Sequence, residues 1–209
     1  MCLAIGKGSS VGDRMVNDPR VPLISVTGST PVGKNIGAVV GRRLGRVIQE
    51  LGGNNAIIVM DDANIDLALR AILFGSVGTA GQRCTSTRRI FLQKGIAKQL
   101  TDRLVKAYAQ IPIGNPLEKG IVMGPLVDRS GVEAMQAALK QVKEQGGEII
   151  CGGEVLTGDK YKSGCYVKPC LVKARHGMKI VEEETFAPIL YLITVNDLEE
   201  AIRGQNDVP

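Results

Sequence analysis

The chain runs VPLISVTGSTP over residues 21–31. Apolar and β-branched residues open this stretch, which predicts a strand at Val21–Val26 that ends in a turn of small residues. Pro31 suits the first turn of a helix, and we expect that helix over Val32–Leu44. A second strand is expected at Arg46–Glu50. Strand, glycine turn, helix and strand in this order predict half of a doubly wound nucleotide-binding sheet.

Strands and helices continue to alternate after Glu50. Further strands are expected at Ala56–Met60, Arg88–Leu92, Glu148–Cys151, Tyr166–Val172 and Ile189–Val195, and helices at Ile65–Val77, Ile96–Ala109, Val132–Gln145 and Leu198–Arg203. The helices are predicted from apolar residues at helical spacing. We therefore expect an α/β fold with one domain at residues 1–50 and another at 51–209. Two strands are few for a doubly wound sheet, so we expect the chain to be a fragment of a longer protein.

The composition is that of an ordinary globular protein, with 44% hydrophobic and 22% charged residues. No apolar run is long enough to span a bilayer, and the N-terminus lacks the pattern of a signal peptide. Five cysteines without a Cys-x-x-Cys pair argue against a disulfide framework or a zinc site and favour a reducing compartment. We expect a cytoplasmic location, with the mitochondrion as the alternative, and no membrane or metal partner.

The net charge of +5 comes from scattered basic residues, with doublets only at Arg42-Arg43 and Arg88-Arg89. We interpret them as a mildly basic surface that attracts anionic small molecules. Aromatic residues make up 3% of the chain and tryptophan is absent, so the stacking platform that single-stranded nucleic acid needs is poorly supplied. Nucleic acid is therefore not an expected partner.

Cys84 is the candidate nucleophile. It ends the run GQRC at residues 81–84, in a loop of small residues after a predicted helix. The neighbouring Arg83 would favour a thiolate, which is the reactive form of cysteine. The alternative is that Cys84 only packs, as most buried cysteines do. We interpret the remaining cysteines as structural: Cys2, Cys151, Cys165 and Cys170. His176 is the only histidine and has no evident partner, so we expect a surface loop residue and no Cys–His pair.

Three other segments could carry chemistry, each with a simpler alternative. Glu50 precedes Leu51-Gly52-Gly53 and could be the base that activates water, or only a solvated charge at a strand end. Gly28, Ser29 and Gly33 could bring backbone amides to a phosphate, or only connect a strand to a helix. Glu184 and Phe186 lie in EETFAP at residues 183–188, which alone would be a solvated acidic run before a strand.

Together, these segments resemble the motifs of the NAD(P)-dependent aldehyde dehydrogenases. The resemblance rests on VTGST at residues 26–30, QELGG at 49–53, GQRC at 81–84 and EETFAP at 183–188, and on the separation of Glu50 from Cys84. It implies a partial Rossmann-type coenzyme domain at residues 1–50 and an α/β catalytic domain at 51–209, truncated at its C-terminus. It also implies NAD as cofactor, a small-molecule aldehyde as substrate, and a dimer or tetramer in the full-length form.

The resemblance also implies a role for each candidate residue. Gly28, Ser29 and Gly33 would lie against the NAD pyrophosphate, Leu51 and Gly52 beside the nicotinamide, and Glu184 would bind the nicotinamide ribose with Phe186 packed nearby. The Cys84 thiolate would form a thiohemiacetal and then a thioester, which water activated by Glu50 would hydrolyse. Thr185 and Ala187 stand where the family commonly has isoleucine and glycine. The family's asparagine oxyanion donor and ribose-binding lysine belong to an N-terminal segment outside this sequence.

Within that family the chain is similar to the antiquitin branch, the α-aminoadipic semialdehyde dehydrogenases of lysine catabolism. Residues 50–58, 77–85, 106–111 and 185–191 carry this similarity. It implies that Arg83 holds the distal carboxylate of the substrate, for which a bidentate guanidinium is suited. The alternative is a structural arginine that binds loop carbonyls.

Two other functions remain open. A CoA-acylating or acyl-phosphate-reducing relative also uses a cysteine thioester, but it needs no base for water, so Glu50 argues against it. A non-catalytic truncated fragment that does not bind NAD alone is the alternative from a different class.

Overall fold

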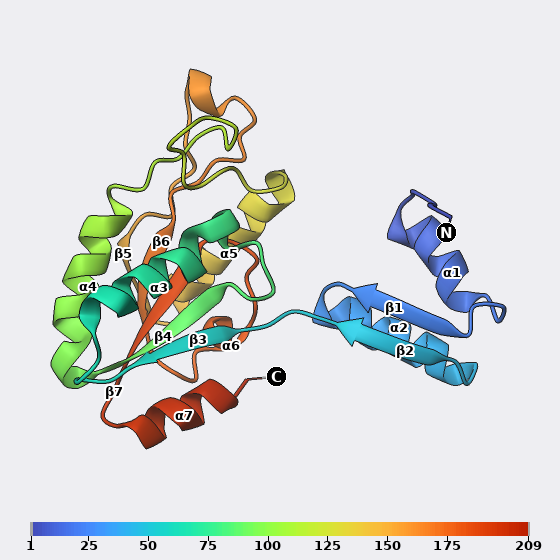
Figure 1. Ribbon diagram of the computed structural model, residues 1–209, viewed down its shortest axis with the longest axis horizontal. Coiled ribbons are helices and arrows are strands. Elements are labelled where there is room, and N and C mark those ends of the chain that lie inside the picture. The colour runs from blue at the N-terminus through green and yellow to red at the C-terminus, as the bar shows by residue number, and fades with distance from the viewer. Residues whose placement is uncertain (1, 209) are drawn as a thin grey trace. The chain divides into compact units, whose positions relative to one another are not determined.

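A computed structural model describes residues 2–208 of the chain, which divides into two compact units (Figure 1). One unit ends at Gly52 and the other begins at Gly53. In chain order the elements are η1 (Gly8–Gly12), α1 (Asp13–Asn17), β1 (Leu23–Thr27), α2 (Thr30–Arg42), β2 (Arg46–Glu50), β3 (Asn55–Val59), α3 (Ile65–Val77), η2 (Gly78–Gly81), β4 (Thr87–Gln93), α4 (Lys94–Tyr108), α5 (Arg129–Glu144), β5 (Glu148–Cys151), η3 (Asp159–Tyr161), β6 (Cys170–Ala174), α6 (Lys179–Glu182), β7 (Ile189–Val195) and α7 (Leu198–Asn206). The assignment of the two parts to a coenzyme and a catalytic domain stays a prediction.

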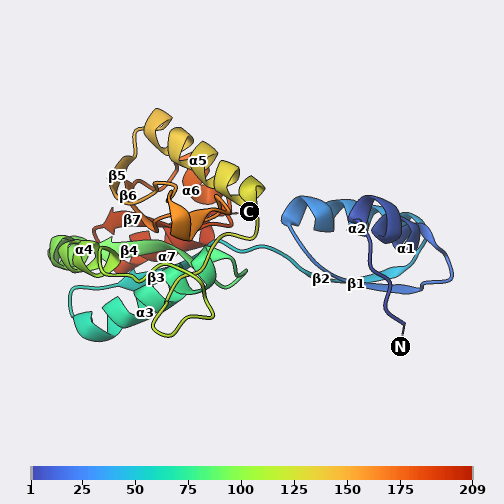
Figure 2. The ribbon, with the colours of Figure 1, turned by 90° about the horizontal axis from the view of Figure 1, so that it is seen from above.

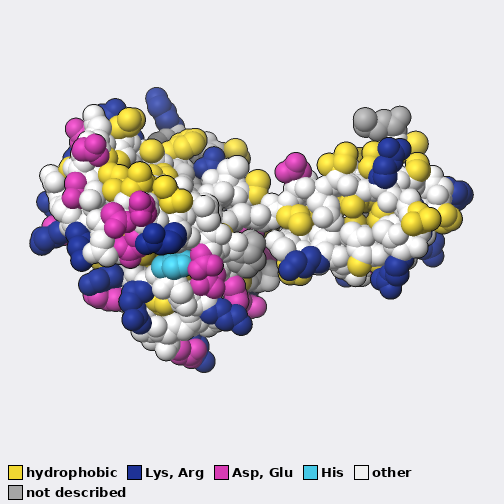
Figure 3. Space-filling model, turned by 90° about the horizontal axis from the view of Figure 1, so that it is seen from below, with side chains coloured by type: hydrophobic (Ala, Val, Ile, Leu, Met, Phe, Trp, Pro, Cys, Tyr) yellow, Lys and Arg dark blue, Asp and Glu magenta, His cyan; other side chains and the backbone are white. Residues whose placement is uncertain are grey.

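The first unit is a two-stranded parallel sheet with its crossover helix. β1 pairs with β2 from Leu23 opposite Arg46 to Thr27 opposite Glu50, and α2 connects the two strands. Ile24 and Val40 are the buried hydrophobic side chains among the described residues of this unit. Apolar side chains of this unit remain exposed on the face in Figure 3. Leu44 is one of the exposed apolar residues of the unit. The unit therefore buries little apolar surface of its own, and a small core of this kind stabilises a fold weakly.

The second unit is built on a five-stranded sheet of order β3-β4-β7-β6-β5. All neighbouring strands are parallel except β5, which pairs antiparallel to β6. The central strands β4 and β7 are buried along almost their whole length, as expected for parallel strands covered on both faces. α3 and α5 lie on opposite faces of this sheet (Figure 2). The expected α/β fold is confirmed.

Side-chain caps set the start of three helices in the second unit. The oxygens of Asn64, Asp128 and Asp197 accept hydrogen bonds from backbone N–H groups in the first turns of α3, α5 and α7. Each bond satisfies one of the donors that a helix start leaves unpaired. Because Asp128 is the cap, α5 begins at Arg129, three residues before the expected start at Val132.

The strand β6 and the helix α6 also differ from the sequence-based expectation. The strand expected at 166–172 forms as β6 at Cys170–Ala174, because Pro169 has no N–H group to donate to the sheet. Val167 instead forms an isolated antiparallel bridge with Val155. The four-residue helix α6 was not expected, since it is too short to show a helical period.

Two kinds of feature are missing from residues 2–208. None of the described helices has the length and apolar character needed to cross a membrane. In the same residues, no group of three or more His, Cys, Asp and Glu side chains could hold a metal ion. On the face in Figure 3, basic and acidic side chains are interspersed over the second unit.

Candidate active site

The predicted residues of the first unit gather at the carboxyl ends of β1 and β2. The N–H group of Gly28, directly after β1, donates to the carbonyl of Glu50, the last residue of β2 (3.0 Å). Ser29 is the N-cap residue of α2, and its side chain makes no cap hydrogen bond within the described structure. The first N–H groups of α2 thus stand beside a small-residue turn, an arrangement that suits a phosphate group. Nucleotides bind at this edge of parallel sheets.

Gly33 shows why a small residue is needed in the first turns of α2. It is buried, and a Cβ atom placed there would overlap the side chain of Leu51. The side chain of Gln49 donates from its Nε2 atom to the Gly33 carbonyl at 2.6 Å. The turn after β1, the helix α2 and the end of β2 are therefore closely packed together. Their predicted contacts with NAD stay predictions.

Cys84 in the second unit lies on an exposed loop between η2 and β4. Cys84 is therefore not packed in the core of the second unit, and its role as a nucleophile stays a prediction. The three residues Thr79, Ala80 and Gly81 all have positive φ, at 56°, 53° and 69°. Non-glycine residues rarely adopt this left-handed conformation, and it tends to persist where surrounding contacts impose it. We therefore expect contacts with the rest of the unit to hold this loop in its left-handed conformation.

Side chains from distant parts of the second unit hold the loop in place. Asn55 donates from Nδ2 to the carbonyls of Cys84 (2.6 Å) and Ser86 (3.0 Å). Gln82 donates to the Pro125 carbonyl and accepts from the N–H group of Val127 at 2.8 Å. These bonds hold the backbone around Cys84, so the place of this residue on the surface of the unit is set by the fold.

We expect Gly81→Ala to lower the free energy of unfolding by about 2–4 kcal/mol. Gly81 has a positive φ of 69°, and an added Cβ atom would overlap the carbonyl oxygen of Ala187. The loss therefore combines a backbone penalty with a steric one. Denaturant unfolding of the variant, compared with the unchanged chain, measures it.

Gly120→Ala is the matched control for this prediction. Gly120 also has a positive φ (88°), but a Cβ atom there would meet no atom within 4 Å. It should lose only the backbone penalty of about 1–2 kcal/mol. Equal losses in the two variants would show that the loop does not depend on close packing against Ala187.

Glu184 and Phe186 lie beside the buried side chain of Arg88, the second residue of β4. Arg88 Nη2 is 2.8 Å from Glu184 Oε1, and the Arg88 Cζ atom lies 5.2 Å from the centre of the Phe186 ring. The side chain of Arg88 is 2% exposed and that of Glu184 is 22% exposed. Burial lowers the pKa of the Arg88 guanidinium, and the charge of Glu184 opposes that shift. Glu184 is therefore half of an ion pair, whereas its neighbour Glu183 is an exposed charge.

Arg83, directly before Cys84, makes the contacts of a structural arginine. Its Nη2 atom donates to the Phe74 carbonyl (3.1 Å), and its Cζ atom lies 5.1 Å from the centre of the Phe74 ring. The Nε atom is buried without a partner among the described residues. These contacts favour the structural alternative for the Nη2 side of the guanidinium. Binding of a substrate carboxylate by its other N–H groups stays a prediction.

Sequence reasoning missed how the arginine doublet at 88–89 is used. It was interpreted as part of a basic surface, but Arg88 is 2% exposed and Arg89 is fully buried. Both side chains are bound by backbone carbonyls, which are invisible in a sequence pattern. Their burial could have been inferred from their position at the start of an apolar strand. Charged residues in such a strand are buried only when they are paired.

Two expectations about single residues were wrong. His176 was expected to have no partner, but its Nε2 atom is 2.9 Å from Asp207 Oδ2. Cys2 was interpreted as structural, but it is exposed, whereas Cys165 and Cys170 are buried and Cys151 is half-buried.

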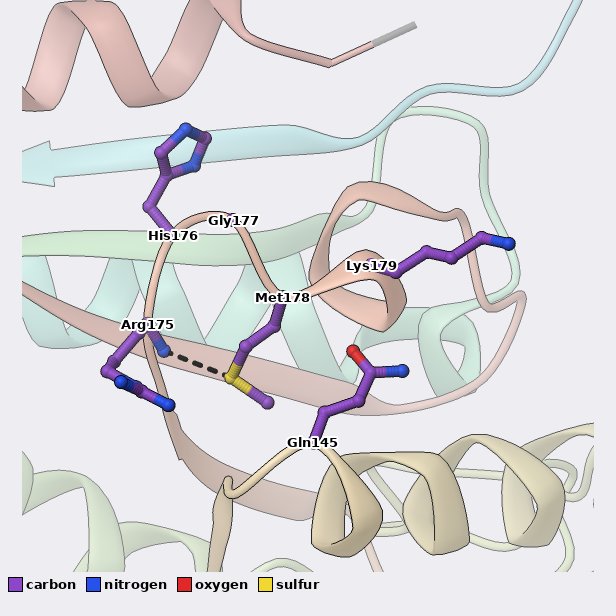
Figure 4. A pocket seen from close by; sticks show the side chains of 6 residues that line it. All are labelled: Gln145, Arg175, His176, Gly177, Met178 and Lys179. Carbon is purple, nitrogen blue, oxygen red and sulfur yellow. Dashed lines mark hydrogen bonds between the residues drawn. The ribbon is translucent and has the colours of Figure 1, made fainter.

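His176 borders a hollow of about 510 Å³ that is also lined by Gln145, Arg175, Gly177, Met178 and Lys179 (Figure 4). None of these residues is a predicted site residue, and the imidazole of His176 points away from Met178 and Gln145.

Comparison with known proteins decides the family. The pattern of the aldehyde dehydrogenase family matches residues 1–209. This chain belongs to the aldehyde dehydrogenase family. A putative aldehyde dehydrogenase family 7 member A1 homolog from Dictyostelium discoideum is 46% identical over 208 residues, which is 100% of this chain and 40% of that protein. The α-aminoadipic semialdehyde dehydrogenase of Mus musculus is 44% identical over 209 residues, which is 100% of this chain and 38% of that protein. The chain thus spans about two fifths of the length of these aldehyde dehydrogenases.

Solved aldehyde dehydrogenases share this fold. Lactaldehyde dehydrogenase from Escherichia coli has a TM-score of 0.93 and 36% identity, over 98% of this chain and 43% of that one. Betaine aldehyde dehydrogenase from Staphylococcus aureus, solved in complex with NAD+, has a TM-score of 0.94 and 31% identity, over 97% of this chain and 41% of that one. The resemblance found in the sequence motifs is therefore confirmed at the level of family and fold.

Proposed function

We propose that this chain carries the nucleophile, the base and part of the coenzyme site of an NAD-dependent aldehyde dehydrogenase of the antiquitin type. The observation that carries the proposal is the exposed Cys84, held on a fixed left-handed loop of the second unit. Such a thiol is accessible to an aldehyde and positioned by the backbone, as nucleophilic catalysis requires. Relatives named α-aminoadipic semialdehyde dehydrogenase support the substrate class.

The coenzyme fits the residues that would hold it. The free N–H groups at the start of α2, with Gly28 and Ser29 before them, suit a pyrophosphate. Glu184 accepts hydrogen bonds from Arg88 and from the Gly53 N–H group through its Oε1 atom. Its Oε2 atom is then available to accept hydrogen bonds from ribose hydroxyls. When bound, NAD supplies the hydride acceptor of the reaction.

The reaction forms and breaks bonds at the sulfur of Cys84. The thiolate adds to the aldehyde carbon, and the Cys84 N–H group donates to the oxyanion of the resulting thiohemiacetal. Loss of hydride from that carbon leaves a thioester on Cys84. Glu50 then takes a proton from water as the water attacks the thioester, and the carboxylic acid leaves while the thiolate is restored. One aldehyde and one water thus give an acid, a hydride and a proton.

The proposed substrate is a semialdehyde that also bears a carboxylate, such as α-aminoadipic semialdehyde. Arg83 is the residue proposed to recognise that carboxylate, with the part of its guanidinium that does not bind Phe74. A guanidinium binds a carboxylate with charge-assisted hydrogen bonds, which are stronger than neutral ones. In the full-length form, the proposed enzyme is a dimer or tetramer.

A non-catalytic fragment is the second candidate. The first unit favours it, because its two-stranded sheet buries few hydrophobic side chains. A unit of this kind would depend on further strands to hold a coenzyme.

NADH formation by the purified chain separates the candidates. We expect kcat/KM for α-aminoadipic semialdehyde to exceed that for hexanal, which has no carboxylate, by about tenfold or more, because a charge-assisted bond contributes that much. Arg83→Met should remove this preference, because it lowers kcat/KM for α-aminoadipic semialdehyde more than kcat/KM for hexanal. If the chain neither binds NAD nor oxidises either aldehyde, the fragment candidate replaces the proposed function. If turnover occurs and Arg83→Met keeps the preference, the role of Arg83 is wrong.

A further inference from the structure

All five N–H donors of Arg88 are engaged in the second unit. Nε donates to the Gly53 carbonyl (3.2 Å), Nη1 to the carbonyls of Gly81 (3.1 Å) and Thr185 (2.7 Å), and Nη2 to the Arg83 carbonyl (3.0 Å) and Glu184 Oε1 (2.8 Å). A guanidinium has five N–H groups in a fixed planar fork, so no donor is left over. One buried side chain thereby fixes three separate segments at once.

These segments are the ones that carry the proposed chemistry. Gly81 and Arg83 lie in the loop that ends at Cys84, so their carbonyls orient the backbone just before the nucleophile. Glu184 and Thr185 lie in the segment proposed to bind the nicotinamide ribose. The relative position of the nucleophile and the coenzyme ligand therefore depends on one guanidinium.

We propose that Arg88 is a positioning residue that sets the Cys84 loop relative to the carboxylate of Glu184. This inference rests on the proposed function for its coenzyme part, whereas its effect on the Cys84 loop stands on the hydrogen bonds alone. Lysine cannot replace Arg88, because an ammonium group has three donors around one atom and cannot reach five acceptors in a plane. The positive charge alone is therefore insufficient.

Arg89 offers a matched control in the same strand. It is also fully buried and binds carbonyls, but those of Asn54 (2.6 Å), Gly204 (2.9 Å) and Gln205 (3.3 Å). Arg89 thus fixes α7 and the start of β3, and makes none of the contacts to the Cys84 loop. Arg89→Lys should destabilise the chain in the same way but disturb the Cys84 loop less, because Arg89 reaches that loop only through Asn54 and its neighbour Asn55.

The test compares Arg88→Lys with Arg89→Lys in the 209-residue chain, at a temperature where thermal unfolding shows both variants folded. The first measurement needs neither coenzyme nor aldehyde. Iodoacetamide alkylates Cys84 and the exposed Cys2. Peptide mass spectrometry then gives the alkylation rate of Cys84 divided by that of Cys2. In Arg88→Lys we expect this ratio to fall by about threefold or more, because the sulfur is no longer held exposed. In Arg89→Lys the ratio should change clearly less than in Arg88→Lys.

The second measurement is the steady-state kinetics of NADH formation. Arg88→Lys should lower kcat by about tenfold to a hundredfold and raise the KM for NAD, since a small displacement of reacting groups costs that much. Arg89→Lys should change both constants clearly less than Arg88→Lys does. If the two variants agree in the alkylation ratio and in kinetics, Arg88 is only structural and the inference is overturned. Failure of the proposed function would appear separately, as absent NADH formation by the unchanged chain, and the alkylation ratio would still decide the role of Arg88.

If Arg88→Lys does not fold, a double variant replaces it in the alkylation measurement. Arg88→Gln with Glu184→Gln removes both charges together, so no unpaired charge stays buried. The same fall in the alkylation ratio of Cys84 is expected. An unchanged ratio in this folded variant would overturn the inference.

Discussion

The Cys84→Ala variant is expected to lose NADH formation by about a thousandfold or more, because the group that forms the covalent intermediate is removed. Cys84 is exposed, so its replacement should change the free energy of unfolding by less than about 0.5 kcal/mol. The variant should also keep its affinity for NAD. The measurement is the rate of NADH formation with α-aminoadipic semialdehyde, alongside thermal unfolding and NAD binding.

Cys2→Ala is the control for this variant, since Cys2 is the other exposed cysteine and lies in the first unit. It should retain full turnover. Turnover that survives Cys84→Ala would refute the proposed mechanism, because in that mechanism the Cys84 thiolate is the group that attacks the aldehyde.

The Glu50→Gln variant should form the thioester and fail to hydrolyse it. We expect one rapid equivalent of NADH per chain, followed by a steady rate lower by about 10²–10⁴-fold, the contribution of a general base. Hydroxylamine attacks a thioester without help from a base, so its addition should restore release. Rapid-mixing kinetics of NADH formation gives both phases.

Glu118→Gln is a suitable control, because Glu118 is an exposed loop carboxylate outside the candidate site. It should show the kinetics of the unchanged chain. A steady rate in Glu50→Gln equal to that of the unchanged chain would mean that another group activates water, or that the acyl group passes to a different acceptor such as CoA.

Much of the fold could be predicted because it depends on local patterns. The apolar period of Ile65–Val77 gave α3 with both ends correct, and Ile189–Val195 gave β7. β6 was misplaced because the effect of Pro169 depends on where its neighbours pair, which the local pattern does not show. The helix α6 was missed because four residues cannot display a period.

The candidate site was predictable in its motifs and not in its geometry. Cys84 could be placed on a loop, since small residues separate a helical pattern from a strand. The left-handed backbone at Thr79 and Ala80 could not be foreseen, because these residue types rarely adopt positive φ. Arg88 could not be recognised either, because its acceptors in residues 184–185 lie far along the chain. Contacts between distant segments decide these features.

The left-handed turn after α3 also has a mechanical consequence. α3 is right-handed, whereas Thr79, Ala80 and Gly81 follow it with the opposite screw sense. A right-handed helix lengthens only by converting the next residues to its own hand, so these three residues act as a stop. Extension of α3 toward Cys84 would thus require these three residues to change hand. The handedness of three residues therefore defines how much chain separates the end of the helix from the nucleophile.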